Sequence, residues 1–394
     1  MSTASVATSY RALFAEPVLR RLAVADAFAR LPQGMVSITV LLVAAEHASM
    51  AVAGLAVAGY TLGQAVTGPV RGRLADRHGL VPVAAACGTG YALALLALLA
   101  GAMAGAPAGL LIGTAAAAGL VNPPLSPGLR SLWSVHAGAG LAPTAFALDA
   151  AVMNLGYIAG PVLAGALAAG LAPAAALGLL LALTGAATVI IGRQPRRSPA
   201  TVAVRQSLVP SPGLRRLMLT AALVNAALSA SEVALTGYVR HHHALWASGP
   251  LLAEVSIGSI LGSLLLGARS GAGARSLLAL LAGYAAGLAL LTAAGLDAPL
   301  LAVAAPLAGF CLGPALAALF GQAAGAAPPG GGTETQAWLN SIMNAGAAAG
   351  AALAGLASRQ PVLALGLSFA LALAAATCAT TGSGDTEART SPVR

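Results

Sequence analysis

The feature that most constrains this chain is a succession of apolar segments, each about 20 residues long, which is the length a helix needs to cross a bilayer. Hydrophobic residues make up 58% of the 394 residues and charged residues only 8%, and the mean hydropathy is +0.86. A soluble domain carries about 25% charged residues. The sequence therefore predicts an all-α integral membrane protein that crosses the bilayer many times.

Twelve apolar segments can be marked along the chain, and each is expected to form one transmembrane helix. A long polar stretch rich in Arg, Pro and Ser follows the sixth segment and is the natural linker between two six-helix halves. The segments lie near 22–45, 50–70, 81–103, 108–132, 142–165, 170–192, 215–239, 248–268, 275–294, 298–322, 335–356 and 360–381.

This pattern predicts four regions. Residues 1–192 form an N-terminal six-helix half, 193–214 a cytoplasmic linker, 215–381 a C-terminal six-helix half and 382–394 a disordered cytoplasmic tail.

Arginine placement predicts the orientation. All 20 basic residues are arginine, and with the N-terminus inside, seventeen of them fall on the cytoplasmic side, including Arg71, Arg73, Arg77 and Arg130. Such a bias is typical of a multi-pass protein of the plasma (inner) membrane with both termini in the cytoplasm. It also accounts for the pI of about 10.5 without nucleic-acid binding, which we do not expect.

A 13-residue pattern occurs twice. "MNLGYIAGPVLAG" starts at Met153, and "MNAGAAAGAALAG" starts at Met343, in the fifth and eleventh segments. A weaker echo links the second and eighth segments through Gly63, Gly68 and Arg71, which match Gly262, Gly267 and Arg269. Matches between segments six apart indicate two parallel halves related by an axis along the membrane normal.

A charged motif, "GRLADRHG", joins the second and third segments on the side predicted to be cytoplasmic. Taken alone, the motif predicts a tight charged turn whose arginines lie on the cytoplasmic side, as the positive-inside rule favours. With twelve spans in two halves, it resembles the signature loop of the major facilitator superfamily, G-x-x-x-D-R-x-G-R-R. Gly72, Asp76, Arg77 and Gly79 match, whereas Leu80 and Val81 replace the two last basic residues. The resemblance implies that Asp76 and Arg77 form a charge latch between the halves.

The first copy of the repeat resembles the antiporter motif of the drug/proton antiporters in that superfamily, G-x-x-x-G-P-x-x-G-G. Gly156, Gly160, Pro161 and Gly165 match, and Ala164 replaces one glycine. Glycines four or five apart let a neighbouring helix approach closely, and a proline bends the helix. Such a face suits a bend that seals the transport path, although ordinary packing of small residues is an open alternative.

Charged residues inside the apolar segments are the candidate functional groups, because a charge at bilayer depth costs about 2.5–3.5 kcal/mol on insertion scales. Asp26 and Arg30 are four residues apart in the first segment and share a helix face. They either pair with each other, or Arg30 contacts substrate or Asp149. Asp149 and Glu232 are candidate proton or cation carriers, since an apolar environment favours the protonated form of a carboxylate. A buried ion pair is the alternative for each.

Two asparagines and a proline cluster complete the candidate features. Asn154 and Asn344 stand at equivalent positions of the repeat and could line the cavity or join helices by hydrogen bonds. The run from Asn122 to Pro127 should bend or interrupt the fourth segment.

No pattern indicates an enzyme, a cofactor or a metal site. The three cysteines, Cys87, Cys311 and Cys378, stand in separate apolar segments without metal-like spacing. We expect a monomer in the lipid bilayer that binds a small-molecule substrate and uses protons as its coupling ion. The antiporter resemblance implies proton-coupled efflux of a drug-like or hydrophobic metabolite by alternating access. An uptake permease for a nutrient or metabolite is the main alternative, and a non-transporting relative that acts as a sensor is a lesser one.

Overall fold

The computed structural model describes residues 3–46, 48–193, 211–241, 248–267, 274–294, 298–357 and 360–380. Most of the predicted linker and the whole predicted tail lie outside this part of the chain. Helices account for nearly all of the described residues, and each of the twelve predicted segments coincides with one helix or with two consecutive helices.

The first half contains the six predicted segments and one further helix at its start. α1 precedes the first predicted segment and was not predicted, because its sequence is too short and too polar to read as a span. Its Leu13 is fully buried in the core. The elements are α1 (Thr3–Ala15), α2 (Pro17–Ala45), α3 (Met50–His78), α4 (Leu80–Met103), α5 (Ala108–Leu120), α6 (Leu125–His136), α7 (Gly138–Gly170) and α8 (Pro173–Gly192).

The first described helix of the second half begins at Pro212. Proline also stands at or near the first position of α2, α8 and α14, where its fixed φ and missing N–H cost the helix no hydrogen bond. The elements are α9 (Pro212–His241), α10 (Ser248–Gly262), the π-helical segment η2 (Ser263–Gly267), α11 (Ala274–Ala294), α12 (Ala298–Gly325), α13 (Gly332–Leu356) and α14 (Pro361–Thr380).

Length and composition identify membrane spans in the described residues. Nine helices there are long and apolar enough to cross a bilayer, and two shorter apolar helices lie at 254–266 and 277–293. Large apolar side chains on the outside of the bundle, such as Leu62, Val66 and Leu93, are more than 60% exposed. Exposed apolar patches of this extent are what a lipid environment requires.

The fourth predicted segment is interrupted as expected. α5 ends at Leu120, and α6 starts at Leu125 after the pair Pro123–Pro124. Proline has no N–H to donate, so carbonyls of the preceding turn need other partners. The Leu120 carbonyl accepts a hydrogen bond from the Thr67 hydroxyl of α3 at 2.7 Å.

The charged motif differs from its prediction. It is not a loop, because α3 continues through it to His78. The chain turns only at Gly79, whose φ of +91° favours glycine. Asp76 and the neighbouring arginines therefore project from the last two turns of a helix.

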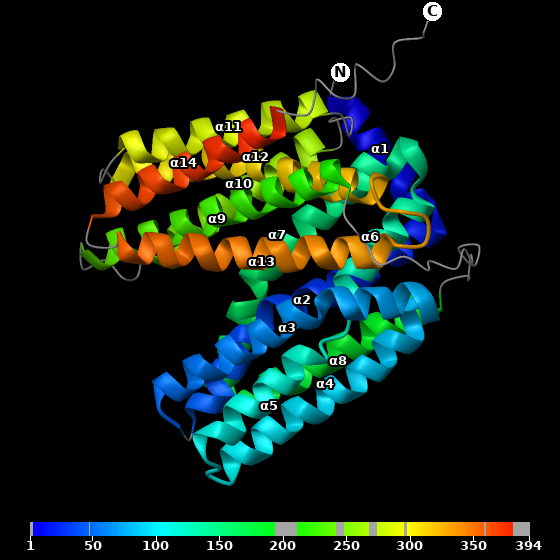
Figure 1. Ribbon diagram of the computed structural model, residues 1–394, viewed down its shortest axis with the longest axis vertical. Helices are drawn as coiled ribbons and strands as arrows, with labels where there is room; N and C mark the ends of the chain where they lie inside the picture. Colours follow the sequence, from blue (N-terminus) through cyan, green and yellow to red (C-terminus); the bar gives the residue numbers. More distant parts are fainter. Residues whose placement is uncertain are drawn as a thin grey trace, which may run out of the picture.

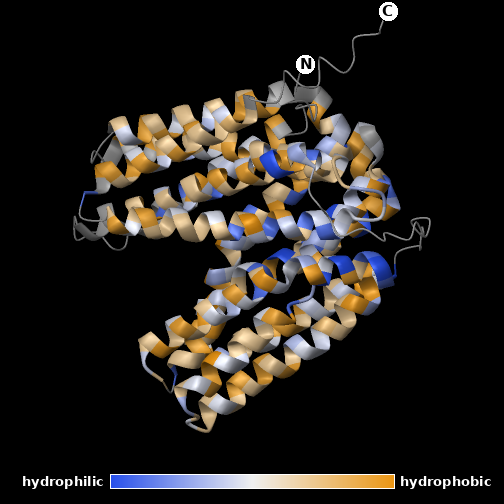
Figure 2. Ribbon diagram, viewed as in Figure 1, coloured by the Kyte–Doolittle hydropathy of each residue, from blue (hydrophilic) through white to orange (hydrophobic). Residues whose placement is uncertain are grey.

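The two halves meet at one end and diverge toward the other (Figure 1). One hydrophobic core joins the second half to Leu19, Leu129 and Trp133 of the first half, and a separate core fills the diverging part of the first half around Tyr60 and Leu95. We call the joined end, which carries α1 and the last turns of α3 and α14, the closed end. Figure 2 shows hydrophilic residues gathered near this contact, whereas the diverging ends are mainly hydrophobic.

The repeated glycines lie where helices of one half cross closely. Gly156 and Gly160 of α7 pack against the α2 backbone, and Gly346 and Gly350 of α13 pack against the α9 backbone in the same way. The glycines of the weaker match also lie at close helix crossings, because Gly63 lies against α5 and Gly262 lies against α12. The repeat thus marks equivalent helix crossings in the two halves.

Candidate functional site

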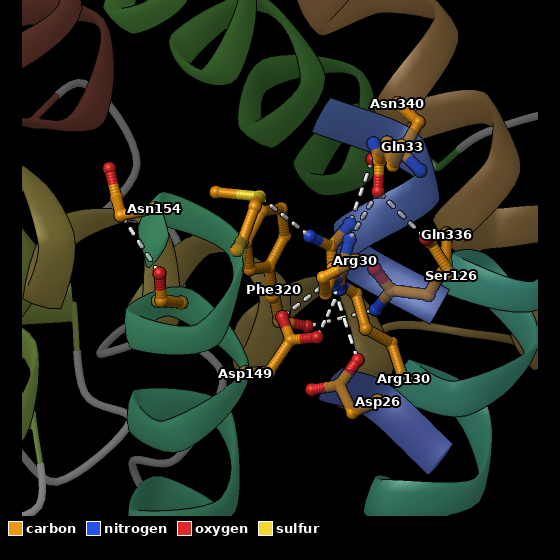
Figure 3. Close-up of polar contacts among 12 residues, drawn as sticks. Asp26, Arg30, Gln33, Ser126, Arg130, Asp149, Asn154, Phe320, Gln336 and Asn340 are labelled. Atoms are coloured by element: carbon orange, nitrogen blue, oxygen red, sulfur yellow. Dashed lines mark hydrogen bonds and ion pairs between the residues drawn. The ribbon is translucent and has the colours of Figure 1, made fainter. Parts of the chain in front are cut away.

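Four charged side chains of α2, α6 and α7 form a buried cluster (Figure 3). Arg30 of α2 donates from Nε to Oδ1 of Asp26, at 3.2 Å, and from Nη2 to Oδ1 of Asp149. Arg130 of α6 donates from Nε to the other oxygen of Asp149, at 2.9 Å. All four side chains are at most 1% exposed. We refer to Asp26, Arg30, Arg130 and Asp149 as the charge cluster.

The charge cluster is electrically balanced, with two guanidinium groups and two carboxylates. Burying an isolated ion is costly, so the mutual neutralisation explains how these side chains coexist at depth. The two carboxylates are not equivalent. Both oxygens of Asp149 are bonded to arginine, whereas Oδ2 of Asp26 is buried without a hydrogen-bond partner among the described residues.

Polar side chains extend the charge cluster toward the space between the halves. Arg30 Nη1 donates to Gln33 Oε1 at 3.1 Å, and the Ser126 hydroxyl donates to the same oxygen at 2.9 Å. Gln33 Nε2 in turn donates to the Tyr157 hydroxyl at 3.3 Å. Three helices, α2, α6 and α7, are therefore tied together by one chain of hydrogen bonds.

Arg130 also reaches the second half. Its Nη1 donates to Asn340 Oδ1 of α13 at 2.8 Å, and its guanidinium lies 3.4 Å from the centre of the Phe320 ring of α12. A cation over an aromatic face is stabilised by the ring quadrupole, more so when it is desolvated. Through Arg130, the charge cluster is therefore part of the contact between the halves.

Two of the arginines that were counted on the cytoplasmic side are buried within the protein. Arg130 is 0% and Arg71 is 6% exposed. Both lie within helices that extend beyond the predicted polar turns, so position near a segment end did not place them at the surface.

A second set of contacts holds the halves together at the closed end. Oδ1 of Asp76 accepts the Thr333 N–H at 3.0 Å, and Oδ2 accepts the Glu334 N–H at 2.8 Å. Asp76 thus lies at the N-terminus of α13, where a negative charge meets unpaired N–H groups and the positive end of the helix dipole. Arg73 Nε donates to Glu334 at 3.0 Å.

Arg77, the other member of the expected latch, is exposed and forms no ion pair with any described residue.

Gly72 belongs to the contact between α3 and α13 for a steric reason. A Cβ there would lie 2.8 Å from Ala337 Cβ and 2.9 Å from Glu334 Cα. We call α3 residues 65–76 and α13 residues 333–341 the junction.

A pocket lies beside the junction and receives residues from both halves. Its wall includes the Pro-rich interruption between α5 and α6 and polar side chains of α2, α3 and α13. Gln33 and Ser126 of the hydrogen-bonded chain also line it. The lining residues are Ala29, Pro32, Gln33, Gln64, Gly68, Arg71, Tyr91, Asn122, Pro123, Pro124, Leu125, Ser126, Pro127, Thr184, Ala337, Asn340, Ser341 and Asn344.

The two asparagines of the repeat have different surroundings. Asn344 lines the pocket, but Asn154 does not. Asn154 donates to the Ala150 carbonyl of its own helix at 2.8 Å and lies apart from the charge cluster in Figure 3. Glu232 of α9 is exposed and lies within electrostatic range of Tyr157 and Tyr284. It is the candidate carboxylate outside the charge cluster.

The glycine motif of α7 lies within the first half, not between the halves. Gly156 packs on the Arg30 carbonyl and Gly160 on Gly34, while Pro161 is exposed within a helix that continues past it. The motif packs α7 closely against α2 and positions Arg30, whereas the sealing bend at Pro161 stays a prediction. Gly165 has no atom near its Cβ position.

Substituting Gly156 tests this packing. A Cβ at Gly156 would lie 2.7 Å from the Arg30 carbonyl oxygen and 3.0 Å from its carbon. We expect Gly156→Ala to lower the free energy of unfolding by about 1–3 kcal/mol, as overpacking does, and to displace Arg30. Thermal unfolding in detergent measures the loss. Gly165→Ala, which meets no atom within 4 Å, is the matched control, and equal stability of the two variants would contradict the prediction.

Sequence reasoning missed several residues of this site. Arg130 was counted only among the arginines of the cytoplasmic side, and Arg73 and Glu334 were not considered for the latch. Helical spacing could have found Arg73, because it lies three residues before Asp76 and so on the same face. No sequence signal pointed to Asn340 or Phe320. Among the described residues, no three His, Cys, Asp or Glu side chains gather to hold a metal ion.

Comparison with known proteins identifies relatives of this architecture. The family model of the Major Facilitator Superfamily matches residues 22–351. A search of curated proteins found no match. The structures of two bacterial proteins are similar. One is a bacterial homologue of the iron transporter ferroportin in an outward-facing state (TM-score 0.78, 15% identity, 94% of this chain and 100% of that chain covered). The other is the fucose:proton symporter FucP of E. coli (TM-score 0.69, 12% identity, 91% of this chain and 98% of that chain covered).

A human structure is similar as well. The organic anion transporter MFSD10 has a TM-score of 0.72 and 17% identity, with 93% of this chain and 100% of that chain covered. At these identities the likeness concerns the fold alone. Together with the all-helical architecture, the matches confirm the predicted fold class.

Proposed function

Because this chain belongs to the Major Facilitator Superfamily, we propose that it exports a small drug-like or hydrophobic molecule in exchange for protons, by alternating access. Membrane transport itself follows from the family and from the transporter fold of its structural neighbours, and the chain is not an enzyme. The direction of transport and the coupling ion are the proposed part.

The observation that carries the proposal is the link between buried charge and the contact of the halves. Arg130 binds Asp149 on one side and Asn340 and Phe320 of the second half on the other. A change in protonation within the charge cluster would therefore alter a contact that must break when the halves rock. Alternating access in this fold is largely rigid-body rocking of one half against the other.

We assign the closed end to the cytoplasmic side. Arg11, Arg20, Arg73 and Arg77 lie in the helices of this end, as the positive-inside rule favours. In this orientation the described conformation is closed toward the cytoplasm. The similarity to a structure named as outward-facing supports this assignment.

The coupling roles differ among the carboxylates. Asp149 lies between two guanidinium groups, which stabilise its ionised form, so it is better suited to hold the arginines in place than to carry a proton. Glu232 is exposed, and one oxygen of Asp26 has no hydrogen-bond partner in the described part of the chain. We therefore assign proton binding to Glu232, and within the charge cluster Asp26 is the carboxylate whose protonation can change.

The proposal predicts the behaviour of Glu232→Gln. In everted vesicles with a pH-sensitive dye, a transported compound from a panel of antibiotics, dyes and metabolites should collapse the pH gradient. Glu232→Gln should abolish this collapse, because its amide cannot take up a proton, while binding of the compound persists. Glu46→Gln, at an exposed carboxylate outside the helices, should behave as wild type.

Two outcomes would change the proposal. Unaltered gradient collapse in Glu232→Gln, together with loss in Asp26→Asn, would move the proton site to Asp26. Accumulation of a labelled metabolite in whole cells without any compound-driven gradient collapse in everted vesicles would favour uptake over export.

A further inference from the structure

We propose that the pocket beside the junction binds the anionic head of an amphipathic organic anion, with Arg71 as the counter-ion. The inference rests on the proposed transport function and names the class of its substrate.

Arg71 is a buried cation whose positive charge is not compensated within the described part of the chain. Its Nε donates to the Thr67 hydroxyl at 3.1 Å, and Nη2 donates to the Gln64 carbonyl at 2.9 Å. The titratable side chains within its electrostatic range are Tyr60 and Cys87, and both types are neutral near pH 7. The guanidinium nitrogen Nη1 makes no hydrogen bond to a described residue, and Arg71 lines the pocket.

Other arginines in the described helices have carboxylate partners. Arg30 and Arg130 share Asp26 and Asp149, and Arg73 pairs with Glu334. Among the arginines that are buried in the described part of the chain, Arg71 thus differs in having no carboxylate beside it. An uncompensated buried charge costs several kcal/mol. A ligand that supplies a negative charge would remove this cost, which makes an anion the occupant that the electrostatics favour.

The rest of the pocket wall suits an anion that carries an apolar body. Asn340 accepts from Arg130 through Oδ1, which leaves its amide N–H groups as donors on the pocket side. Gln64 and Asn122 are further amides of the wall. Tyr91 and the proline pair Pro123–Pro124 form an apolar face. A few convergent polar groups on a mainly apolar wall are typical of sites for small organic ligands.

The pocket also touches both halves where they are in contact. Arg71 immediately precedes Gly72, which packs against α13. On α13, the Ser341 hydroxyl lines the pocket and donates to the Ala65 carbonyl of α3 at 2.9 Å. An anion bound at Arg71 therefore contacts α3 and α13 at once. Binding of the anion can therefore change the equilibrium between the closed and open junction. A transported substrate must have such an effect on the equilibrium between conformations.

The test is equilibrium binding to the purified full-length protein in detergent, followed by thermal unfolding. The probes are matched series with one body and different heads: phenylacetate, 4-phenylbutanoate and naphthalene-2-sulfonate, each with its amide and its amine. Anions should raise the unfolding temperature more than their amides and amines. Arg71→Gln should weaken anion binding about ten- to hundredfold, in line with the loss of charge-assisted hydrogen bonds. Arg71→Lys should retain the preference for anions at lower affinity.

Controls separate this site from a general charge effect. Arg77→Gln removes an exposed arginine of the same helix and should bind anions as wild type does. Sodium chloride and sodium phosphate, added alone, should stabilise the protein less than the organic anions. Equal stabilisation by chloride would mean a site for an inorganic ion and would overturn the organic substrate class.

Stability of the ligand-free variant provides an independent readout. Removing an uncompensated buried charge relieves a cost, so ligand-free Arg71→Gln should unfold at the same temperature as wild type or higher. Arg130→Gln, which breaks an ion pair, should unfold at a lower temperature. A marked loss of stability in Arg71→Gln would show that Arg71 is compensated in the ligand-free protein and would overturn the proposal. So would a panel in which no anion stabilises the wild type better than its amide.

Failure of this inference is distinguishable from failure of the proposed function. Binding is measured without a proton gradient, so anion-specific binding with no gradient collapse in vesicles would refute proton exchange and leave the anion site standing. Proton movement driven by neutral or cationic compounds, unaffected by Arg71→Gln, would refute the anion site and leave proton exchange standing.

Discussion

Asp149→Asn is expected to destabilise the protein by about 3–5 kcal/mol, the range measured when one partner of a buried ion pair is removed. Asp149 accepts from both Arg30 and Arg130. The substitution would leave two buried guanidinium groups against a single carboxylate. Transport should be lost as well, because Arg130 would no longer be held against the second half. Thermal or denaturant unfolding of the purified protein measures the first effect and vesicle transport the second.

A double substitution tests the electrostatic origin of this effect. Asp149→Asn combined with Arg130→Gln restores equal numbers of positive and negative charges and should be more stable than Asp149→Asn alone. Asn154→Ala removes only a hydrogen bond to the same helix and should have a much smaller effect. If Asp149→Asn unfolds like wild type, the charge cluster is not the ion-paired unit described above.

Asp76→Asn is expected to shift the protein toward the conformation that opens at the closed end. The carboxylate accepts two backbone N–H groups of α13, and an asparagine oxygen can replace only one. A hydrogen bond to a charged group contributes about 1.5–3 kcal/mol, which corresponds to roughly a 10- to 150-fold change in the equilibrium between the two conformations.

The distance between two spin labels measures this shift. In a cysteine-free background, one label is placed at His78→Cys, beside the end of α3, and the other at Ala326→Cys, between α12 and α13. Asp76→Asn should increase the population with a long distance. Arg77→Gln, at an arginine without an ion pair in the described residues, should leave the distribution unchanged. An unchanged distribution in Asp76→Asn would mean that the N-terminal contact of α13 does not hold the halves together.

The fold was accessible from the sequence because the physics of a bilayer acts on length and average composition. The twelve segments and the interruption near Pro123 coincide with helices and a helix break among the described residues. Helix ends were less accessible. The end of α3 was placed too early, because Arg71, Arg73, Asp76 and Arg77 lower the hydropathy of a helix that in fact continues to His78.

The candidate site was accessible only where a charge stood out from an apolar background. Asp26, Arg30 and Asp149 were found in this way, and the structure brings them together. Arg130 was missed because it lies near the end of the fourth predicted segment and was counted among the arginines that set the orientation. Its partners Asn340 and Phe320 lie 210 and 190 residues further along the chain, and no periodicity in one sequence reports contacts at such a separation.

The position of Arg130 and Asp149 on successive spans has a consequence for how the chain enters the membrane. α6 carries an arginine that costs about 2.5–3.5 kcal/mol at the bilayer centre on insertion scales, and it follows an interruption that weakens the span further. The neutralising carboxylate arrives only with α7, 19 residues later. The two spans are therefore best inserted as a hairpin, whereas α2 brings Asp26 and Arg30 into the bilayer already paired. During synthesis, α5 and α6 would wait at the translocon until α7 emerges.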